Sequence, residues 1–223
     1  MTQNIDKRPT LQIVFGAFLL LFLGGIVAWS LKVGPSFWPL RGGSQKSLEG
    51  PGDFGTVPDF SLVERSKRTF NLHELRGKIW IANFIFTTCT ETCPTQSAAL
   101  AGLQSDLDLK GKIKLVSITV DPKRDTPEVL SQYASRLGAH PDQWFFLTGK
   151  QEEIYRLAQQ GFHLGAAQVA NSSNNPAYIH SSRLVLVDGE AKIRGYYESN
   201  DPQALHKLTH DIKLILRQDK TYG

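Results

Sequence analysis

The sequence IWIANFIF, residues 79–86, runs directly into TTCTETCP, residues 87–94. A short apolar run of this kind is typical of a strand that is buried on both faces of a sheet. Pro94 suits the first position of a helix, and an apolar stripe then continues the helical spacing through Leu100, Leu103 and Leu107. We therefore predict a buried strand followed by a helix, with Cys89 and Cys93 at the junction.

The remaining chain alternates between strand and helix patterns. Expected strands are residues 60–63, 69–70, 113–120, 144–147, 183–187 and 193–197, and expected helices are a short one from 71 and longer ones at 126–138, 151–160 and from 201. The last two strands flank Asp188-Gly189, which favours a hairpin. This alternation predicts an α/β sandwich built on a mixed sheet.

The N-terminal region differs in composition from the rest. Residues 9–31 carry no charge, and about 20 apolar residues are enough to cross a bilayer as a helix. We expect a short tail at 1–10, a transmembrane anchor at 11–31, a linker rich in Gly, Pro and Ser at 32–57, and a folded domain at 58–220. A cleaved signal peptide is the alternative, with a small-residue site at 28–30.

Positive charges lie on both sides of that segment, with Lys32, Arg41 and Lys46 after it, so their count does not decide its orientation. Lys7 and Arg8 precede it and resemble the start of an export signal, which would leave the tail inside and send the domain across the membrane. The expected location is therefore a bacterial inner membrane, with one span and a periplasmic domain. The formal net charge of +4 is spread along the chain without a basic cluster, so we do not expect a nucleic-acid partner.

Cys89 and Cys93 are the only two cysteines among 223 residues. The start of a helix offers unpaired N–H groups and a positive dipole end, which favour a thiolate. At a spacing of four, both sulfurs can lie on one side of a helix and converge on one atom. Such a pair can cycle between dithiol and disulfide or bind a soft metal ion, and the pair alone leaves both open.

One of the six histidines, His180, is a candidate for a third metal ligand beside the two cysteines. His180 comes just before the expected strand 183–187, and if that strand is central in the sheet, its start lies near the cysteines. Two thiolates and one imidazole suit copper, as Cu(I) or Cu(II), better than a structural zinc site, which normally has four protein ligands. Asp121 follows another buried strand, at the same edge of the sheet as the cysteines. It is either an auxiliary metal ligand or docking charge, or an ordinary turn residue.

Four segments together resemble the Sco/SenC family of copper-binding proteins. They are Pro58-Asp59-Phe60, Phe86-Thr87-Thr88-Cys89 through Cys93-Pro94, Val120-Asp121-Pro122 through Asp125-Thr126-Pro127, and His180-Ser181. The resemblance covers about residues 57–216. It implies a thioredoxin-like fold, copper bound by Cys89, Cys93 and His180, an assisting role for Asp121, and a role in maturing the copper centre of cytochrome c oxidase.

Three functional hypotheses follow. The first is a membrane-anchored copper metallochaperone, a carrier rather than an enzyme, which holds one copper ion per chain and passes it to the copper-bearing subunit of cytochrome c oxidase. It needs a thiol reductant, because copper binding requires both cysteines reduced. The second is a thiol-disulfide oxidoreductase in which Cys89 attacks and Cys93 resolves, and the third is a sensor of copper or redox state.

Overall fold

The structure is a computed structural model that describes residues 51–90, 92–106, 109–164 and 181–219. These residues belong to the compact unit Leu48–Gly223. The expected anchor at 11–31 and most of the expected linker at 32–57 lie outside the described residues. Within the described ranges, no helix is both long enough and apolar enough to cross a membrane.

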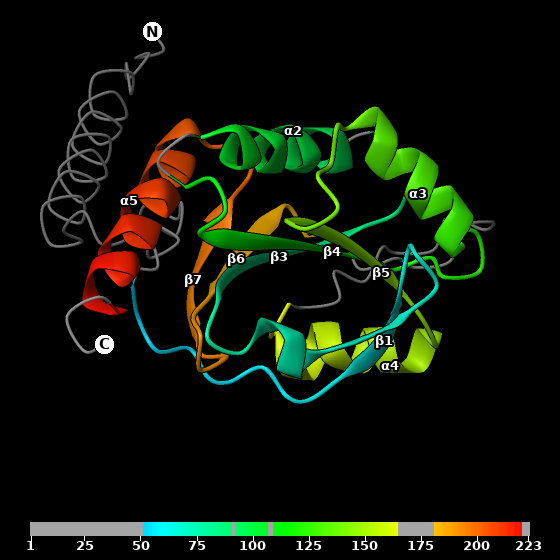
Figure 1. Ribbon diagram of the computed structural model, residues 1–223, viewed down its shortest axis with the longest axis horizontal. Helices are drawn as coiled ribbons and strands as arrows, with labels where there is room; N and C mark the ends of the chain where they lie inside the picture. The colour runs from blue at the N-terminus through cyan, green and yellow to red at the C-terminus, as the bar shows by residue number, and fades with distance from the viewer. Residues whose placement is uncertain (1–50, 91, 107–108, 165–180, 220–223) are drawn as a thin grey trace, which may run out of the picture. The chain divides into compact units, whose positions relative to one another are not determined.

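A mixed sheet forms the centre of the described domain (Figure 1). Its strands lie in the order β2-β1-β5-β4-β3-β6-β7. Their bounds are β1 Ser61–Glu64, β2 Thr69–Asn71, β3 Ile79–Ile85, β4 Ile113–Thr119, β5 Trp144–Thr148, β6 Arg183–Val187 and β7 Ile193–Glu198. The prediction of an α/β fold on a mixed sheet is confirmed.

Strand β3 lies near the middle of the sheet, as its apolar sequence predicts. All seven of its residues are buried. It runs parallel to β4, with Ile85 opposite Thr119, and antiparallel to β6, with Ala82 opposite Val185. The carboxyl ends of β3 and β4 and the start of β6 therefore meet at one edge of the sheet, directly before the cysteines.

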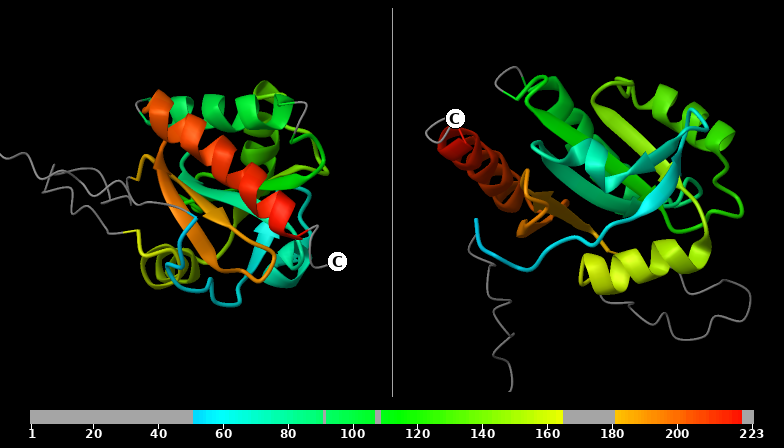
Figure 2. Two further views of the ribbon diagram at one scale, coloured as in Figure 1. Left: turned by 90° about the vertical axis from the view of Figure 1, so that its left-hand side faces the viewer. Right: turned by 60° about the horizontal axis from the view of Figure 1, so that its bottom comes forward.

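Helices α2, α3 and α5 pack against one face of the sheet (Figure 2). Their bounds are α2 Thr92–Ser105, α3 Pro127–Arg136 and α5 Pro202–Asp219. Strand β3 contributes Ile79, Ile81 and Ile85 to this core, and helices α2 and α3 add Leu100 and Leu130. Since side chains alternate along a strand, Asn83 points to the same face as Ile81 and Ile85.

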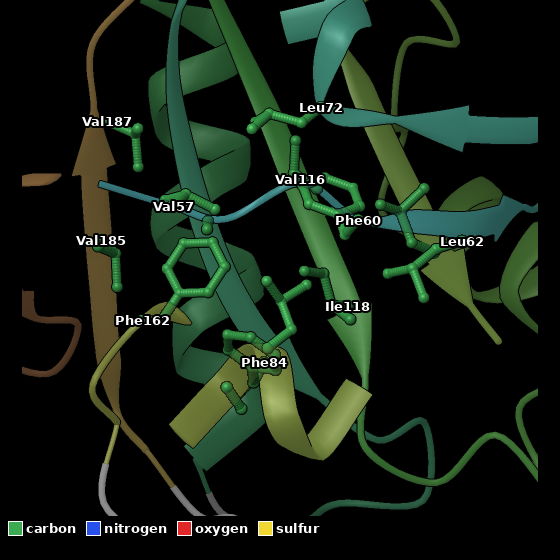
Figure 3. Packing of buried hydrophobic residues seen from close by; sticks show 14 of the residues in the cluster. Val57, Phe60, Leu62, Leu72, Phe84, Val116, Ile118, Phe162, Val185 and Val187 are labelled. Atoms are coloured by element: carbon green, nitrogen blue, oxygen red, sulfur yellow. The ribbon is translucent and has the colours of Figure 1, made fainter. Parts of the chain in front are cut away.

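The opposite face packs against η2 (Leu72–Leu75), α4 (Gln151–Arg156) and the π-helical turn η3 (Leu157–Gly161). Figure 3 shows Phe84 of β3 and Phe162, after η3, in this second core. The rings of these two residues meet edge to face, with centroids 5.4 Å apart. The helix expected at 151–160 is thus present, but its last turn is wider than an α-helix.

Local signals explain several element boundaries. Asn71 and Glu74 form the predicted capping box of η2, and the hydroxyl of Thr126 caps α3, whose first residue is Pro127. Gly138 adopts a φ of 64° just after α3, a conformation that favours glycine. Helix α2 begins at Thr92, so Pro94 is its third residue rather than the expected first.

Candidate metal and redox site

The cysteines lie where the polypeptide turns from β3 into α2. The backbone N–H of Cys89 donates to the carbonyl of Phe86 at 3.1 Å, which closes a turn after the strand. Cys93 is the second residue of α2 and is only 3 % exposed, whereas Cys89 is half-buried. No disulfide bond joins the two sulfurs. The expected placement at a strand-to-helix junction is confirmed.

A backbone contact links the two residues. The N–H of Cys93, in the first turn of α2, donates to Sγ of Cys89 at 3.4 Å. An N–H at a helix start stabilises a negative sulfur more than a neutral one, since the helix dipole adds to the hydrogen bond. Cys89 is therefore placed to act as a thiolate, whether toward a metal ion or toward a disulfide.

Asp125 anchors the loop before the cysteines, a role that the sequence reasoning did not assign. Its buried carboxylate accepts hydrogen bonds from the N–H of Thr87 at 3.0 Å and from the hydroxyl of Thr87 at 2.5 Å. It also accepts the hydroxyl of Thr119, the last residue of β4, at 2.5 Å. The feature of the sequence that could have indicated this role is the presence of hydrogen-bonding side chains, Thr87 and Thr119, at the ends of two adjacent strands.

Asp121 lies at the same edge of the sheet as the cysteines, as predicted. It is 6 % exposed, and its carboxylate is 3.4 Å from the guanidinium of Arg124. Its backbone carbonyl accepts the N–H groups of Arg124 and Asp125, so Asp121 also forms the turn that leads to α3. Its expected assistance to a metal ion stays a prediction.

His180 lies outside the described residues, but the segment that follows it is placed. The carbonyl of Ser181 accepts a hydrogen bond of 2.6 Å from Nε2 of Gln96, on α2. Gln96 is three residues after Cys93 and is fully buried. The residue next to His180 is thus bonded to the helix that carries Cys93, which agrees with the expectation that this segment approaches the cysteines.

The described part of the chain contains no cluster of three or more His, Cys, Asp or Glu side chains that could bind a metal ion. The other five histidines are exposed: His73, His140, His163, His206 and His210. His206 and His210, four residues apart on α5, both face solvent.

A tyrosine and a serine also pack beside the thiols. The hydroxyl groups of Tyr133, on α3, and Ser97, on α2, are 2.9 Å apart. Burial raises the pKa of Tyr133, and the nearby Cys93 and Cys89 add to this effect when they are negatively charged. Tyr133 is thus a neutral phenol at pH 7 and links α3 to the first turns of α2.

Comparisons with known proteins identify the family. The family model described as SCO1/SenC matches residues 49–217. The SCO1 protein homolog of Bacillus subtilis is 30% identical over 159 residues, which cover 70% of this chain and 81% of that protein. A protein of Stutzerimonas stutzeri, named as a candidate copper-binding protein, is 30% identical over 74% of this chain and 78% of its own length.

Solved structures show the same fold. A SCO1/SenC family lipoprotein from Bacillus anthracis superposes with a TM-score of 0.64 at 27% identity, over 74% of this chain and 96% of that chain. BsSco, described as a member of the Sco family of cytochrome c oxidase assembly proteins with a disulfide switch, gives 0.62 at 29% identity over 73% and 94%. The domain has the thioredoxin-like α/β fold of these neighbours. The chain belongs to the SCO1/SenC family.

Proposed function

We propose that this protein carries copper through Cys89, Cys93 and His180 and delivers it to cytochrome c oxidase during assembly. Copper is the cargo in this proposal, held one ion per chain and passed on by ligand exchange. The observation that carries the proposal is the contact between the Cys93 N–H and Sγ of Cys89, together with the bond that ties the residue after His180 to the same helix.

The donor set fits copper. Two thiolates are soft ligands that favour Cu(I), and an imidazole allows the same site to accept Cu(II). Two cysteines with one histidine leave a structural zinc site one ligand short. The half-buried Cys89 gives an acceptor protein access to one sulfur, while Cys93 is covered by the core.

Copper binding depends on the redox state of the cysteines. A disulfide between Cys89 and Cys93 would remove both thiolates, so an oxidising compartment requires a reductant for each round of loading. A relative, BsSco, is described as containing a disulfide switch. We infer that the same pair here serves both as the metal ligands and as the element that turns binding off.

The N-terminal segment gives the expected location. We propose that residues 11–31 anchor the chain in a bacterial inner membrane and that residues 32–57 tether the domain on the periplasmic side. A membrane tether would confine the search for an oxidase subunit to two dimensions.

A second candidate function is thiol-disulfide exchange, and the unequal burial of the two cysteines favours it. Cys89 is half-buried and accepts an N–H bond, so it suits an attacking thiolate, whereas the buried Cys93 suits a resolving thiol. In this role the protein would keep the copper-site cysteines of the oxidase reduced.

A copper titration of the reduced full chain, purified in detergent without oxygen, tests the proposal. We expect one ion per chain, an absorption band from thiolate-to-Cu(II) charge transfer, and loss of tight binding in Cys89→Ser and Cys93→Ser. His180→Ala should weaken Cu(II) binding, whereas His206→Ala, an exposed histidine of α5, should bind as the wild type does.

Two outcomes would contradict the proposal, and the first of them would favour thiol-disulfide exchange instead. If His180→Ala bound copper as tightly as the wild type and the wild-type chain reduced disulfides at catalytic rates, the carrier proposal would be abandoned. If both cysteine variants kept tight copper binding, the ligand set itself would be wrong.

A further inference from the structure

A directed line of buried hydrogen bonds crosses the sheet and ends at Ser181, the residue that follows His180 in the sequence. The indole N–H of Trp144 donates to Oγ of Ser117 at 2.9 Å, and Ser117 donates to Oδ1 of Asn83 at 2.7 Å. Asn83 then donates to Oε1 of Gln96 at 3.3 Å, and Gln96 donates to the carbonyl of Ser181 at 2.6 Å. We call these four side chains, Trp144, Ser117, Asn83 and Gln96, the amide relay.

The direction of the amide relay is fixed at its inner end. An indole nitrogen can only donate, so Ser117 accepts from Trp144 and turns its own proton toward Asn83. The carbonyl oxygen of the Asn83 amide therefore faces Ser117, and its NH₂ group faces Gln96. Since the carbonyl oxygen of the Gln96 amide accepts from Asn83, its NH₂ group faces Ser181. The contact between Gln96 and Ser181 is therefore a hydrogen bond from an amide donor to a backbone carbonyl.

Each member of the amide relay is almost completely buried. Trp144, Asn83 and Gln96 are 0 % exposed, and Ser117 is 1 % exposed. These hydrogen bonds are shielded from water, so a shift of Ser181 would leave the Gln96 NH₂ group without that partner inside the core. Trp144, Ser117, Asn83 and Gln96 belong to β5, β4, β3 and α2, respectively (Figure 1).

The amide relay joins the two halves of the proposed copper site. Gln96 lies one helical turn after Cys93 on α2, and Ser181 directly follows His180. We propose that Gln96 is a positioning residue for the proposed metal site, because it fixes the backbone of Ser181, the residue that follows His180 in the sequence, relative to the helix that carries Cys93. This inference rests on the proposed function and adds to it a residue that binds no metal.

The test compares Gln96→Met with Gln104→Met in the full chain. Methionine matches glutamine in length but cannot donate to a carbonyl. Gln104 is a fair control because it lies on the same helix and also bridges two backbone groups, the carbonyl of Gly138 and the N–H of His140, at the other end of α2. Electron paramagnetic resonance of bound Cu(II) reports imidazole nitrogen coupling, and competition titrations report affinity for Cu(II) and Cu(I).

We expect Gln96→Met to lower Cu(II) affinity by about 10-fold or more, the range seen when residues that support metal ligands are replaced. The nitrogen coupling should weaken or become heterogeneous, while Cu(I) affinity should change less because both thiolates remain. Gln104→Met should alter neither property. Ser117→Ala, which interrupts the amide relay two bonds away with little change in volume, should shift the nitrogen coupling in the same direction to a smaller extent.

His180→Ala separates the two ways in which the proposal could fail. If His180→Ala loses nitrogen coupling while Gln96→Met and Ser117→Ala keep the wild-type spectrum and affinity, the positioning role is refuted and the copper site stands. If His180→Ala itself leaves the spectrum unchanged, histidine ligation is refuted and the positioning role falls with it. Equal losses in Gln96→Met and Gln104→Met would show a general effect of stability and would also refute it.

Discussion

Asp125 accepts hydrogen bonds from both the backbone N–H and the hydroxyl of Thr87, two residues before Cys89. The two residues are 38 positions apart in the sequence, yet this contact fixes where the cysteine loop leaves the sheet. The same carboxylate holds the end of β4 through Thr119. The loop with the proposed metal ligands is therefore positioned by a buried charge outside the cysteine motif.

Replacing Asp125 by Asn should destabilise the fold and loosen the cysteine loop. Asparagine offers one acceptor oxygen in place of two and carries no negative charge, so we expect a loss of about 2 kcal/mol in the free energy of unfolding, as for other hydrogen bonds to charged groups. Urea unfolding of the reduced full chain measures this loss. Asp59→Asn, an exposed residue, is the control and should change stability by less than about 0.5 kcal/mol. Equal stability of the two variants would refute the anchor role.

Oxidation of the cysteine pair should abolish copper binding reversibly. An oxidised chain has no thiolate to offer, so its copper content should fall to near zero and return to the reduced level after treatment with a phosphine reductant. Thiol titration and copper analysis of the same sample measure both quantities. A chain that retained tightly bound copper with no titratable thiol would contradict this expectation.

Asp121 should have little influence on Cu(I) affinity, so that any assistance it gives to the metal site comes from outside the ligand set. Carboxylate oxygen is a hard donor that suits copper less than thiolate does, and this carboxylate already lies near Arg124. We expect Asp121→Asn to change the affinity for Cu(I) by less than about threefold, which corresponds to about 0.65 kcal/mol. A tenfold loss in a competition titration would show instead that Asp121 belongs to the ligand set.

Stability at alkaline pH should depend on Tyr197. Burial raises the pKa of Tyr197, and the hydrogen bond of 2.7 Å to buried Asp211 raises it further. A raised pKa in the folded state means that this stabilisation is complete below pH of about 10, the ordinary value, and is lost as pH rises above it, at up to about 1.4 kcal/mol per pH unit.

The Tyr197→Phe variant checks this dependence, because it removes the titrating group. Urea unfolding at pH 9 and pH 11, with reductant present, should show a smaller loss of stability in Tyr197→Phe than in the wild type. Identical losses in the two proteins would refute the contribution of Tyr197.

Much of the fold could be predicted because its signals are local. The apolar run 79–86 became the central strand β3, the capping box at Asn71 formed as expected, and the hairpin of β6 and β7 followed from its turn. The start of α2 was misplaced by two residues, because the turn after Phe86 lets the helix begin before Pro94. The π-helical end of α4 had no signal in the apolar pattern.

The site was only partly predictable for a physical reason. The spacing of Cys89 and Cys93 and the apolar strand before them indicate a functional pair. Gln96 and Asp125 do not, because their roles depend on partners far along the chain, Ser181 and Thr87, which only the folded sheet brings near. A buried polar residue can be recognised as such only after its burial is known.

X-ray absorption at the copper edge tests the central claim most directly. For the reduced full chain loaded with one copper ion, we predict two sulfur ligands and one imidazole, one sulfur fewer in Cys89→Ser or Cys93→Ser, and no imidazole in His180→Ala. A spectrum with only nitrogen and oxygen donors, or one that neither cysteine substitution changes, would contradict the account.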